Sequence, residues 1–217
     1  MTTVPVGSRL APFAEVFSAA LHGAPCVVQE REGESLVLPV ERWGAAADDS
    51  DRALLSHCRG RTLDIGCGPG RMSAHLAALG VTVAGIDLVD DAVRRSRARG
   101  VTTWRCDVFG EVPGAGCWDT ALLADGNLGI GGDPVRLLRR VGELLAPGGR
   151  VVADLAPYGQ GVRTRVLALR TDTLHCRPFP WATVGADSIA TVASAAGLGV
   201  PEVHEHAGRW FAVLGAS

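Results

Sequence analysis

Lysine is absent from this sequence of 217 residues, so all 21 of its lysine-or-arginine cations are arginine. We interpret this bias as a consequence of genomic base composition and not as a functional signal. The formal net charge is −2 and the sequence pI is about 6.3. A general nucleic-acid binder concentrates basic charge on one face or along one stripe. We therefore expect no nucleic-acid partner.

Long apolar runs are also missing, and none approaches the roughly 20 residues that a membrane-spanning helix needs. The start of the chain, MTTVPVGSRLAPF, has neither the charged region nor the following apolar region of a signal peptide. We therefore expect a cytoplasmic protein with no membrane partner. The six cysteines form no C-x-x-C pair and show no cysteine–histidine spacing typical of zinc sites. This pattern predicts reduced thiols and no metal.

From residue 61 onwards, patterns typical of strands and helices alternate along the chain. The predicted strands span 61–65, 81–87, 101–107, 118–125 and 150–156. The predicted helices span 69–80, 90–100, 133–149 and 187–199, with glycine, proline or aspartate at most of their ends. Residues 201–215 are typical of a closing hairpin. The alternation predicts an α/β fold with helices on both faces of a mostly parallel sheet.

Two stretches fall outside this rhythm. Residues 1–60 contain an amphipathic pattern that includes Phe13 and Phe17, then a hairpin-like segment, then a helix beginning near residue 48. Residues 157–186 are rich in glycine, proline and arginine. Such segments often carry specificity on a rigid sheet. We expect 1–60 to form a cap segment and 61–217 to form the core, with 157–186 as an excursion on the substrate side.

The stretch LDIGCGPG, residues 63–70, predicts a ligand site. A glycine-rich turn between a strand and a helix exposes unpaired N–H groups at the helix N-terminus, where anions and nucleotides bind. Dinucleotide sites usually show G-x-G-x-x-G, but Arg71 stands where that pattern has its third glycine. Asp87 stands at the end of the next predicted strand, 21 residues after Gly66, and is placed to accept hydrogen bonds from ribose hydroxyls.

The chain resembles class I S-adenosylmethionine-dependent methyltransferases of the small-molecule type. LDIGCGPG is similar to the first motif of that family, GIDLVDDAV to the second and CDV to the segment that reads adenine. WDTALLADGN resembles the fourth motif, and LLAPGGRVVAD resembles the turn and fifth strand that follow. The resemblance covers about 61–156 well, the final hairpin in outline, and the two irregular stretches hardly at all. It implies a Rossmann-like, doubly wound, seven-stranded sheet with an antiparallel C-terminal hairpin strand, and S-adenosylmethionine as cofactor.

The resemblance also implies roles for individual residues. Asp64 would orient the loop or meet the methionyl amine, Asp87 would hold the ribose, and Leu88 would lie against adenine. Asp107 would accept from the adenine amino group beside the Val108 amide. The alternative for Asp64 and Asp107 is that each caps a neighbouring turn. The implied cofactor-binding set is Asp64, Gly66, Cys67, Gly68, Gly70, Asp87, Leu88, Asp107, Val108 and Asp125. Within it, Cys67 is interpreted as a small residue inside the turn and not as a reactive thiol.

Methyl transfer from a sulfonium is an in-line displacement, so its main requirement is to place a nucleophile about 3 Å from the methyl carbon. The candidate catalytic residues are Asp125, Asn127 and His175, of which Asp125 and His175 could act as bases. Asp125 can alternatively orient the acceptor or cap a turn. Two further aromatic residues, Tyr158 and Trp181, are candidates for the wall of the acceptor pocket, and Trp43 could close over the methionyl end or simply pack.

The acceptor is expected by exclusion to be a small molecule, with an O, N, C or S nucleophile and a possible place in natural-product metabolism. The stretch Asp125–Leu128 lacks the Asn/Asp-Pro-Pro-aromatic pattern of enzymes that methylate flipped bases. Two alternatives stay open: a non-catalytic protein that binds S-adenosylmethionine, and a nicotinamide-dependent oxidoreductase. Nothing in the sequence separates a monomer from a homodimer.

Overall fold

The computed structural model describes residues 8–30 and 35–215. Its helices are α1 (Phe13–Leu21), α2 (Val40–Gly44), α3 (Asp49–Leu55), α4 (Arg71–Ala78), α5 (Asp90–Ala98), α6 (Pro134–Leu144) and α7 (Ile189–Ala196), with a 3₁₀ turn, η1, at Asn127–Gly129. Its strands are β1 (Arg9–Ala11), β2 (Val27–Glu30), β3 (Ser35–Val37), β4 (Thr62–Ile65), β5 (Val83–Asp87), β6 (Thr102–Arg105), β7 (Trp118–Leu123), β8 (Leu145–Leu155), β9 (Val162–Arg170), β10 (Leu174–Cys176), β11 (Phe179–Val184), β12 (Glu202–His206) and β13 (Arg209–Gly215).

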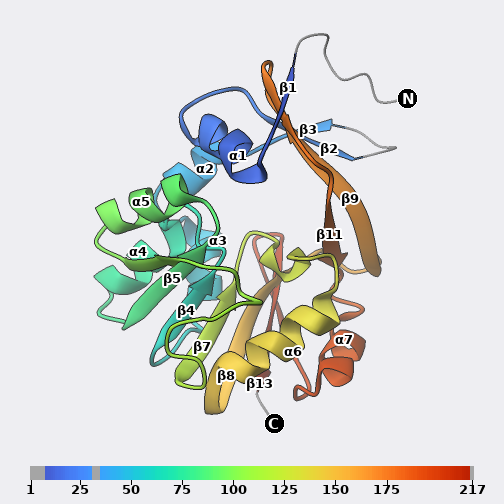
Figure 1. Cartoon of the computed structure of the whole chain (residues 1–217). Helices are drawn as coiled ribbons and strands as arrows, with labels where there is room; N and C mark the ends of the chain where they lie inside the picture. Colours follow the sequence, from blue (N-terminus) through green and yellow to red (C-terminus); the bar gives the residue numbers. More distant parts are fainter. Residues whose placement is uncertain (1–7, 31–34, 216–217) are drawn as a thin grey trace.

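Seven strands form the core sheet in the lower part of Figure 1, in the order β12-β13-β8-β7-β4-β5-β6. The neighbours from β8 to β6 pair in parallel. β13 is antiparallel to both β8 and β12, so it is the reversed strand of the C-terminal hairpin. The predicted α/β, Rossmann-like, seven-stranded sheet is therefore confirmed. The strand order changes direction at β4, since the chain continues to β5 and β6 on one side and to β7 and β8 on the other. The carboxyl end of β4 therefore lies beside those of β5 and β7, where open α/β sheets bind ligands.

Side chains alternate between the two faces of this sheet. On one face Ala121 and Leu123 join the apolar stripe of α6, Leu137, Leu138, Val141 and Leu144, each fully buried. On the other face Leu122 packs with side chains from α3 and α4. Full burial of one such leucine contributes roughly 1.5–3 kcal/mol. The helical layers on both faces hold the strand ends rigidly in place.

Helix α6 ends earlier than the sequence predicted. Its start agrees with the prediction, because the Asp133 side chain accepts from the Arg136 N–H and Pro134 occupies the first turn. The helix stops at Leu144, and β8 begins at once with Leu145. Pro147 and the glycines after it disfavour helix, and Gly148 has a φ of +73°. The predicted helix over 133–149 is wrong in its last turn for that reason.

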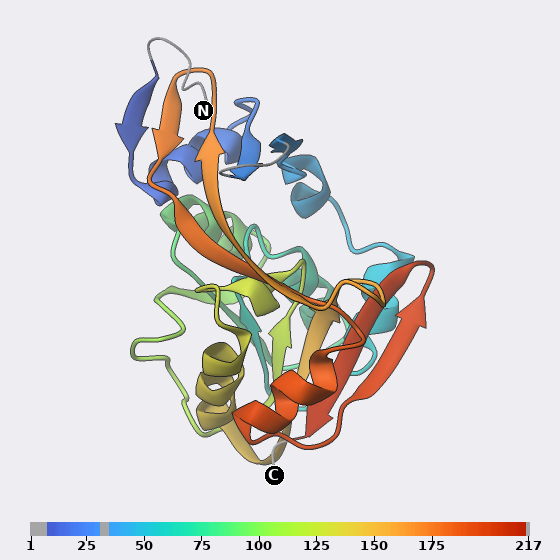
Figure 2. The ribbon, with the colours of Figure 1, turned by 90° about the vertical axis from the view of Figure 1, so that its right-hand side faces the viewer.

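A second, six-stranded sheet lies above the core sheet (Figures 1 and 2). Its central strand is β9, which pairs antiparallel with β2 on one side and with β10 and β11 on the other. β3 continues the sheet beyond β2, and β1 beyond β10. The two irregular stretches of the sequence thus meet in one structure, which we call the upper sheet. α1 packs beneath it and also contacts α5 of the core.

Candidate functional site

The glycine loop joins β4 to α4 in a conformation that needs glycine. Gly66 and Gly70 have φ values of +70° and +86°, which L side chains rarely adopt. A Cβ on Gly66 would lie 2.7 Å from the Asn127 amide nitrogen, and one on Gly70 would lie 2.9 Å from the Ser96 Cα. Gly68 has open space on that side instead. The loop therefore presents bare backbone to a cavity at the N-terminus of α4.

Asp87 at the end of β5 is linked to this loop. Its Oδ2 accepts from the Gly68 N–H at 2.9 Å, and its Oδ1 accepts from the Val89 N–H at 2.9 Å. Burial raises the pKa of the carboxyl, while these backbone hydrogen bonds favour the ionised form. Leu88 beside it is 51% exposed. The carboxylate and an apolar side chain thus flank the cavity next to the glycine loop.

The end of β6 borders the same cavity. Asp107 Oδ1 accepts from the Phe109 N–H at 2.9 Å, which is the turn-capping geometry that the sequence left open. Asp107 nevertheless lines the cavity, and so does the buried Val108. One oxygen of the Asp107 carboxylate has no part in that cap. Asp107 can therefore cap the turn with one oxygen and still offer the other oxygen to a ligand in the cavity.

Asp64 lies outside the cavity lining. It is 1% exposed, and the Ser73 hydroxyl on α4 donates to its Oδ2 at 2.5 Å. Burial raises its pKa to about 7. This contact joins β4 to α4, which favours the orienting role over contact with a ligand. Cys67 is also buried, and burial raises the pKa of its thiol well above the ordinary value, which agrees with a packing role.

Asp125 and Asn127 follow β7 and line the same cavity as Asp87. The Asn127 amide donates to the carbonyl oxygens of Ile65 and Gly66, at 2.9 Å each, and so fastens this segment to the glycine loop. Asp125 has a φ of +52° and its Oδ2 lies 2.6 Å from the Arg71 guanidinium. Its other oxygen lies 3.6 Å from Arg209. Two guanidinium groups therefore fix the orientation of the Asp125 carboxylate.

These contacts belong to a buried charge network that the sequence did not reveal. Arg71 and Arg209 both pair with Asp51 on α3, and Arg209 also binds Asp154 at the end of β8, with Nε donating at 2.7 Å. Asp51 is fully buried, and burial raises the pKa of Asp154. The network joins five segments of the chain, from α3 to β13. In the sequence, Arg71 stands out only because it occupies the third glycine position of the dinucleotide-binding pattern. No motif near Asp51, Asp125 or Arg209 predicts that these residues join Arg71 in one network.

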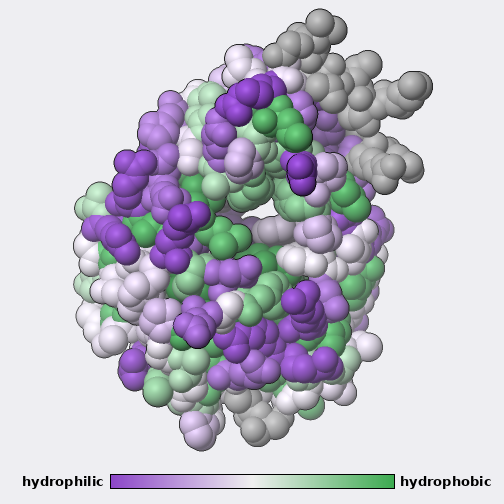
Figure 3. Space-filling model, viewed as in Figure 1, coloured by the Kyte–Doolittle hydropathy of each residue, from purple (hydrophilic) through white to green (hydrophobic). Residues whose placement is uncertain are grey.

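Two cavities adjoin this network. The larger, of about 900 Å³, extends from the glycine loop to the upper sheet, and the smaller has about 550 Å³. Figure 3 shows a hollow between the upper and lower parts of the molecule, with hydrophobic surface beside it. Asp125, Trp43 and Trp181 line both cavities, so these residues form the wall between them. The larger volume lies near the top of the roughly 300–1,000 Å³ range of small-molecule sites.

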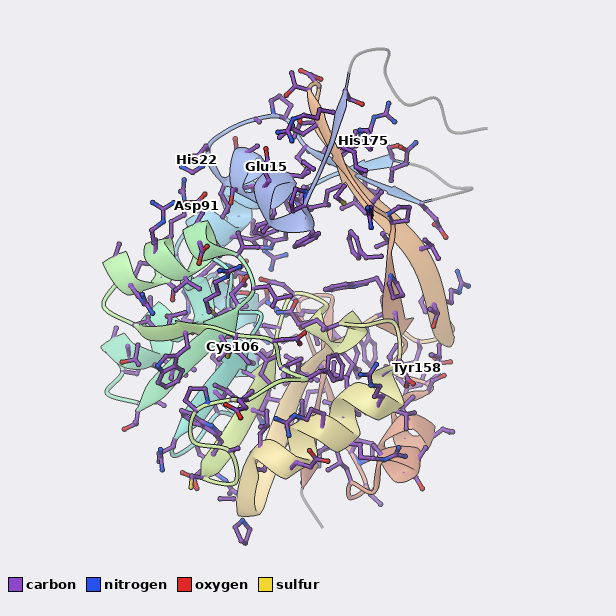
Figure 4. The ribbon with its side chains drawn as sticks, viewed as in Figure 1. Glu15, His22, Asp91, Cys106, Tyr158 and His175 are labelled. Carbon is purple, nitrogen blue, oxygen red and sulfur yellow. The ribbon has the colours of Figure 1, made fainter. Side chains whose placement is uncertain are left out.

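The remaining candidates divide by position. Trp43 and Trp181 reach the cavities, as expected of pocket-lining residues. His175 does not: it lies on β10 in the upper sheet, where its Nδ1 lies 3.0 Å from the Ser8 hydroxyl, and it lines neither cavity (Figure 4). Tyr158 is 59% exposed, packs edge-on against Trp210, and likewise lines neither cavity. Because both residues belong to the excursion at 157–186, we expected them near the acceptor. In the structure β9 and β11 of this segment reach the large cavity, but His175 and Tyr158 do not.

The fold and the site together define the class of protein. The strand order with its reversed β13, the glycine loop after β4, and the acidic residue after β5 are those of a class I methyltransferase. The family model for the methyltransferase domain matches residues 42–200. The chain therefore belongs to the methyltransferase domain family, whose methyl donor is S-adenosylmethionine. This confirms the resemblance and the predicted cofactor, and it disfavours the nicotinamide alternative.

Three similar proteins illustrate the relationship. A ribosomal RNA small subunit methyltransferase C from Chromohalobacter salexigens is 39% identical over 103 residues, and a ubiquinone biosynthesis O-methyltransferase from Xanthomonas euvesicatoria is 33% identical over 100 residues. Each match covers 42% of this chain, and it spans only 30% and 41% of the two relatives, respectively. The crystal structure of a methyltransferase from Bacteroides fragilis in complex with S-adenosylhomocysteine has a TM-score of 0.79 and 21% identity, covering 96% of this chain and 98% of that one.

Within residues 8–30 and 35–215, no helix is both long and apolar enough to cross a bilayer.

Proposed function

We propose that this protein transfers a methyl group from S-adenosylmethionine to a small molecule bound in the 900 Å³ cavity. The observation that carries the proposal is the cavity itself, which joins the glycine loop and Asp87 to a second wall supplied by the upper sheet. One continuous space of this size accommodates a cofactor and an acceptor side by side. The two sequence relatives differ in acceptor, one acting on ribosomal RNA and one in ubiquinone biosynthesis. The small-molecule choice therefore rests on the cavity and on the net charge of −2.

The residues present fit the cofactor. The bare backbone at Gly68 has the open space that a methionyl group needs, and the adjacent helix N-terminus is ready to bind its carboxylate. The Asp87 carboxylate, though already hydrogen-bonded to two backbone N–H groups, lines the cavity and can accept from ribose hydroxyls. Leu88 and Val108 offer apolar contact to a flat base, and the second oxygen of Asp107 can accept from its amino group. When bound, S-adenosylmethionine supplies an electrophilic methyl group on a sulfonium.

The protein's own part in the reaction is chiefly positioning. Asn127 holds the segment after β7 against the glycine loop, and Asp125 is fixed by Arg71 and Arg209. This arrangement gives the acceptor a rigid wall, and a well-aligned approach of about 3 Å is what an in-line displacement requires. We assign Asp125 an orienting role toward the acceptor. His175 is not part of this proposal, because it does not reach the cavity. The acceptor atom is an O, N, C or S nucleophile, and we place the acceptor in natural-product metabolism.

Cofactor binding is tested with Asp87→Ala and isothermal titration of S-adenosylhomocysteine. Loss of two hydrogen bonds to a carboxylate is expected to weaken binding about 100-fold or more. Asp90→Ala is the matched control, since that carboxylate is exposed and contacts only Arg105 at 3.4 Å among its ion-pair partners in the described residues. Equal affinity in the wild type and the Asp87 variant would overturn the ribose assignment.

Catalysis is tested separately, by incubating the protein with a cell extract and S-adenosylmethionine labelled in its methyl group. We expect label to appear in the fraction of small molecules. A protein that binds S-adenosylhomocysteine but transfers no label to any fraction would be the non-catalytic binder instead. Label in the RNA fraction alone would overturn the small-molecule proposal and leave the methyltransferase assignment intact.

A further inference from the structure

Aromatic residues are scarce in this sequence, with five phenylalanines, five tryptophans and one tyrosine, yet five of them gather on one wall of the large cavity. Their rings follow one another in a chain from Trp43 through Phe17, Phe13 and Phe179 to Trp181. The successive ring centroids lie 5.6, 5.6, 5.1 and 6.3 Å apart. We call this row the aromatic arc. None of its members belongs to the glycine loop or to the strand ends that hold the cofactor residues.

The periodicity of two elements builds the arc. Phe13 and Phe17 are four residues apart on α1 and so lie on one helix face. Phe179 and Trp181 are two residues apart on β11 and so lie on one face of the upper sheet. All four are half-buried in the structure, whereas Phe211 in the core is only 2% exposed. The rings keep exposed surface because they face the cavity.

Close packing fixes one end of the arc beside the reaction centre. A Cβ on Gly129 would lie 2.5 Å from the Trp181 Nε1 and 2.1 Å from the Ala182 carbonyl oxygen. Only a glycine therefore lets β11 lie directly on η1, the turn that begins at Asn127. The ring of Trp181 is thus held next to the segment that borders the methyl group in the proposed reaction.

On the side of the large cavity, the only charged side chain that the described residues place beside the arc is that of Asp125, which lines the cavity together with Trp43 and Trp181. The upper sheet, α1 and the segment from Leu38 to Trp43 contribute only apolar side chains to the lining of the large cavity. The charged groups that line it come from the core: Arg71, Asp87, Asp107 and Asp125. Burying an ammonium or a phosphate against an uncharged wall is strongly unfavourable without a partner. Flat apolar molecules, in contrast, gain from stacking on aromatic rings as well as from burial.

We propose that the aromatic arc binds the ring system of the methyl acceptor, and that the acceptor is a planar, uncharged, predominantly aromatic molecule. This inference rests on the proposed function, because it places the acceptor in the cavity that the cofactor shares. It narrows the substrate class from small molecules in general to compounds that can stack. It also assigns Phe13, Phe17 and Phe179 to substrate specificity, a role that their positions in the sequence did not indicate.

The test uses the full chain saturated with S-adenosylhomocysteine and three probes whose binding is measured by ligand-observed NMR. The probes are 2-naphthol, its saturated counterpart trans-decahydro-2-naphthol, and the cyclohexyltrimethylammonium cation. We expect 2-naphthol to bind about tenfold more tightly than the saturated alcohol. Equal binding of the two alcohols, or tighter binding of the cation, would overturn the proposal, the latter in favour of a cation-binding aromatic box.

Variants locate the effect within the cavity. Phe179→Leu keeps an apolar side chain but removes one ring, so it is expected to reduce the preference for 2-naphthol several-fold while leaving S-adenosylhomocysteine affinity within about twofold. Tyr158→Leu is the control, because it removes an aromatic ring that lies outside both cavities. An unchanged preference in Phe179→Leu would contradict the proposal. If S-adenosylhomocysteine does not bind the wild type, the proposed function is refuted. The three probes are then compared without S-adenosylhomocysteine, and this comparison still tests whether the aromatic arc prefers planar, uncharged rings.

Discussion

Relative to the wild type, the Asp64→Asn variant is expected to have a free energy of unfolding that becomes larger as the pH rises. The carboxyl is fully buried and its pKa is raised by burial from 3.8 to about 7. Between those values the folded state retains a proton that the unfolded state releases, so the wild type loses stability as pH increases through this window. The loss is complete above the folded pKa. Three pKa units correspond to at most about 4 kcal/mol.

The asparagine side chain has nearly the same shape and can still accept from the Ser73 hydroxyl, but it never ionises. Urea unfolding of both proteins from pH 5 to pH 8 measures the difference in the free energy of unfolding. That difference is expected to grow in favour of the variant by roughly 3 kcal/mol at most over this range. Asp49→Asn is the control. The Arg52 side chain lowers the pKa of this exposed carboxyl below 3.8, so it stays ionised in the folded and unfolded states throughout this range, and its removal predicts a difference that does not change with pH. If the difference in unfolding free energy between the wild type and Asp64→Asn stays constant with pH, the burial argument is refuted.

Three further outcomes follow from packing and charge. Leu138→Ala, at a fully buried position on α6, is expected to lower the free energy of unfolding by about 2–5 kcal/mol in urea titration. Gly70→Ala introduces a Cβ within 2.9 Å of the Ser96 Cα at a left-handed φ, and should lower the free energy of unfolding by more than about 1 kcal/mol in urea titration. Arg209→Leu leaves the Asp154 carboxylate buried without its guanidinium, and thermal unfolding should report a loss of about 3–5 kcal/mol at pH 8; an unchanged midpoint would show that the network adds nothing to stability.

The core sheet could be predicted from the sequence because its signals are local. Each strand lies between turns, and Gly80 and Gly100 end helices at φ values of +79° and +83°. The residues of the glycine loop and Asp87 are neighbours for the same reason, since adjacent parallel strands end at the same edge. The early end of α6 shows the limit of this reasoning, because an apolar stripe can continue from a helix into a strand without a break.

The upper sheet could not be predicted in the same way. Its central pairing joins Val27 to Arg170, which are 143 residues apart, and no turn signal connects them. A local signal for β9 did exist, because Val162, Thr164 and Val166 alternate with arginines as in a half-exposed strand. The ion pair between Arg71 and Asp125 was hidden for a related reason. Buried pairs depend on which loops meet, and no periodicity in the sequence carries that information.

Because β2 and β9 are far apart in the sequence, the ribosome synthesises these paired strands at different times. The β2–β3 hairpin leaves the ribosome early, but its partner strand follows only after the nucleotide-binding half of the core, β4 to β7, has been made. At about 5–20 residues per second, that delay is on the order of 10 seconds. Until then the edge of β2 that pairs with β9 has no partner strand. The strands that carry the glycine loop and Asp87 are therefore synthesised before the strand that completes the upper sheet.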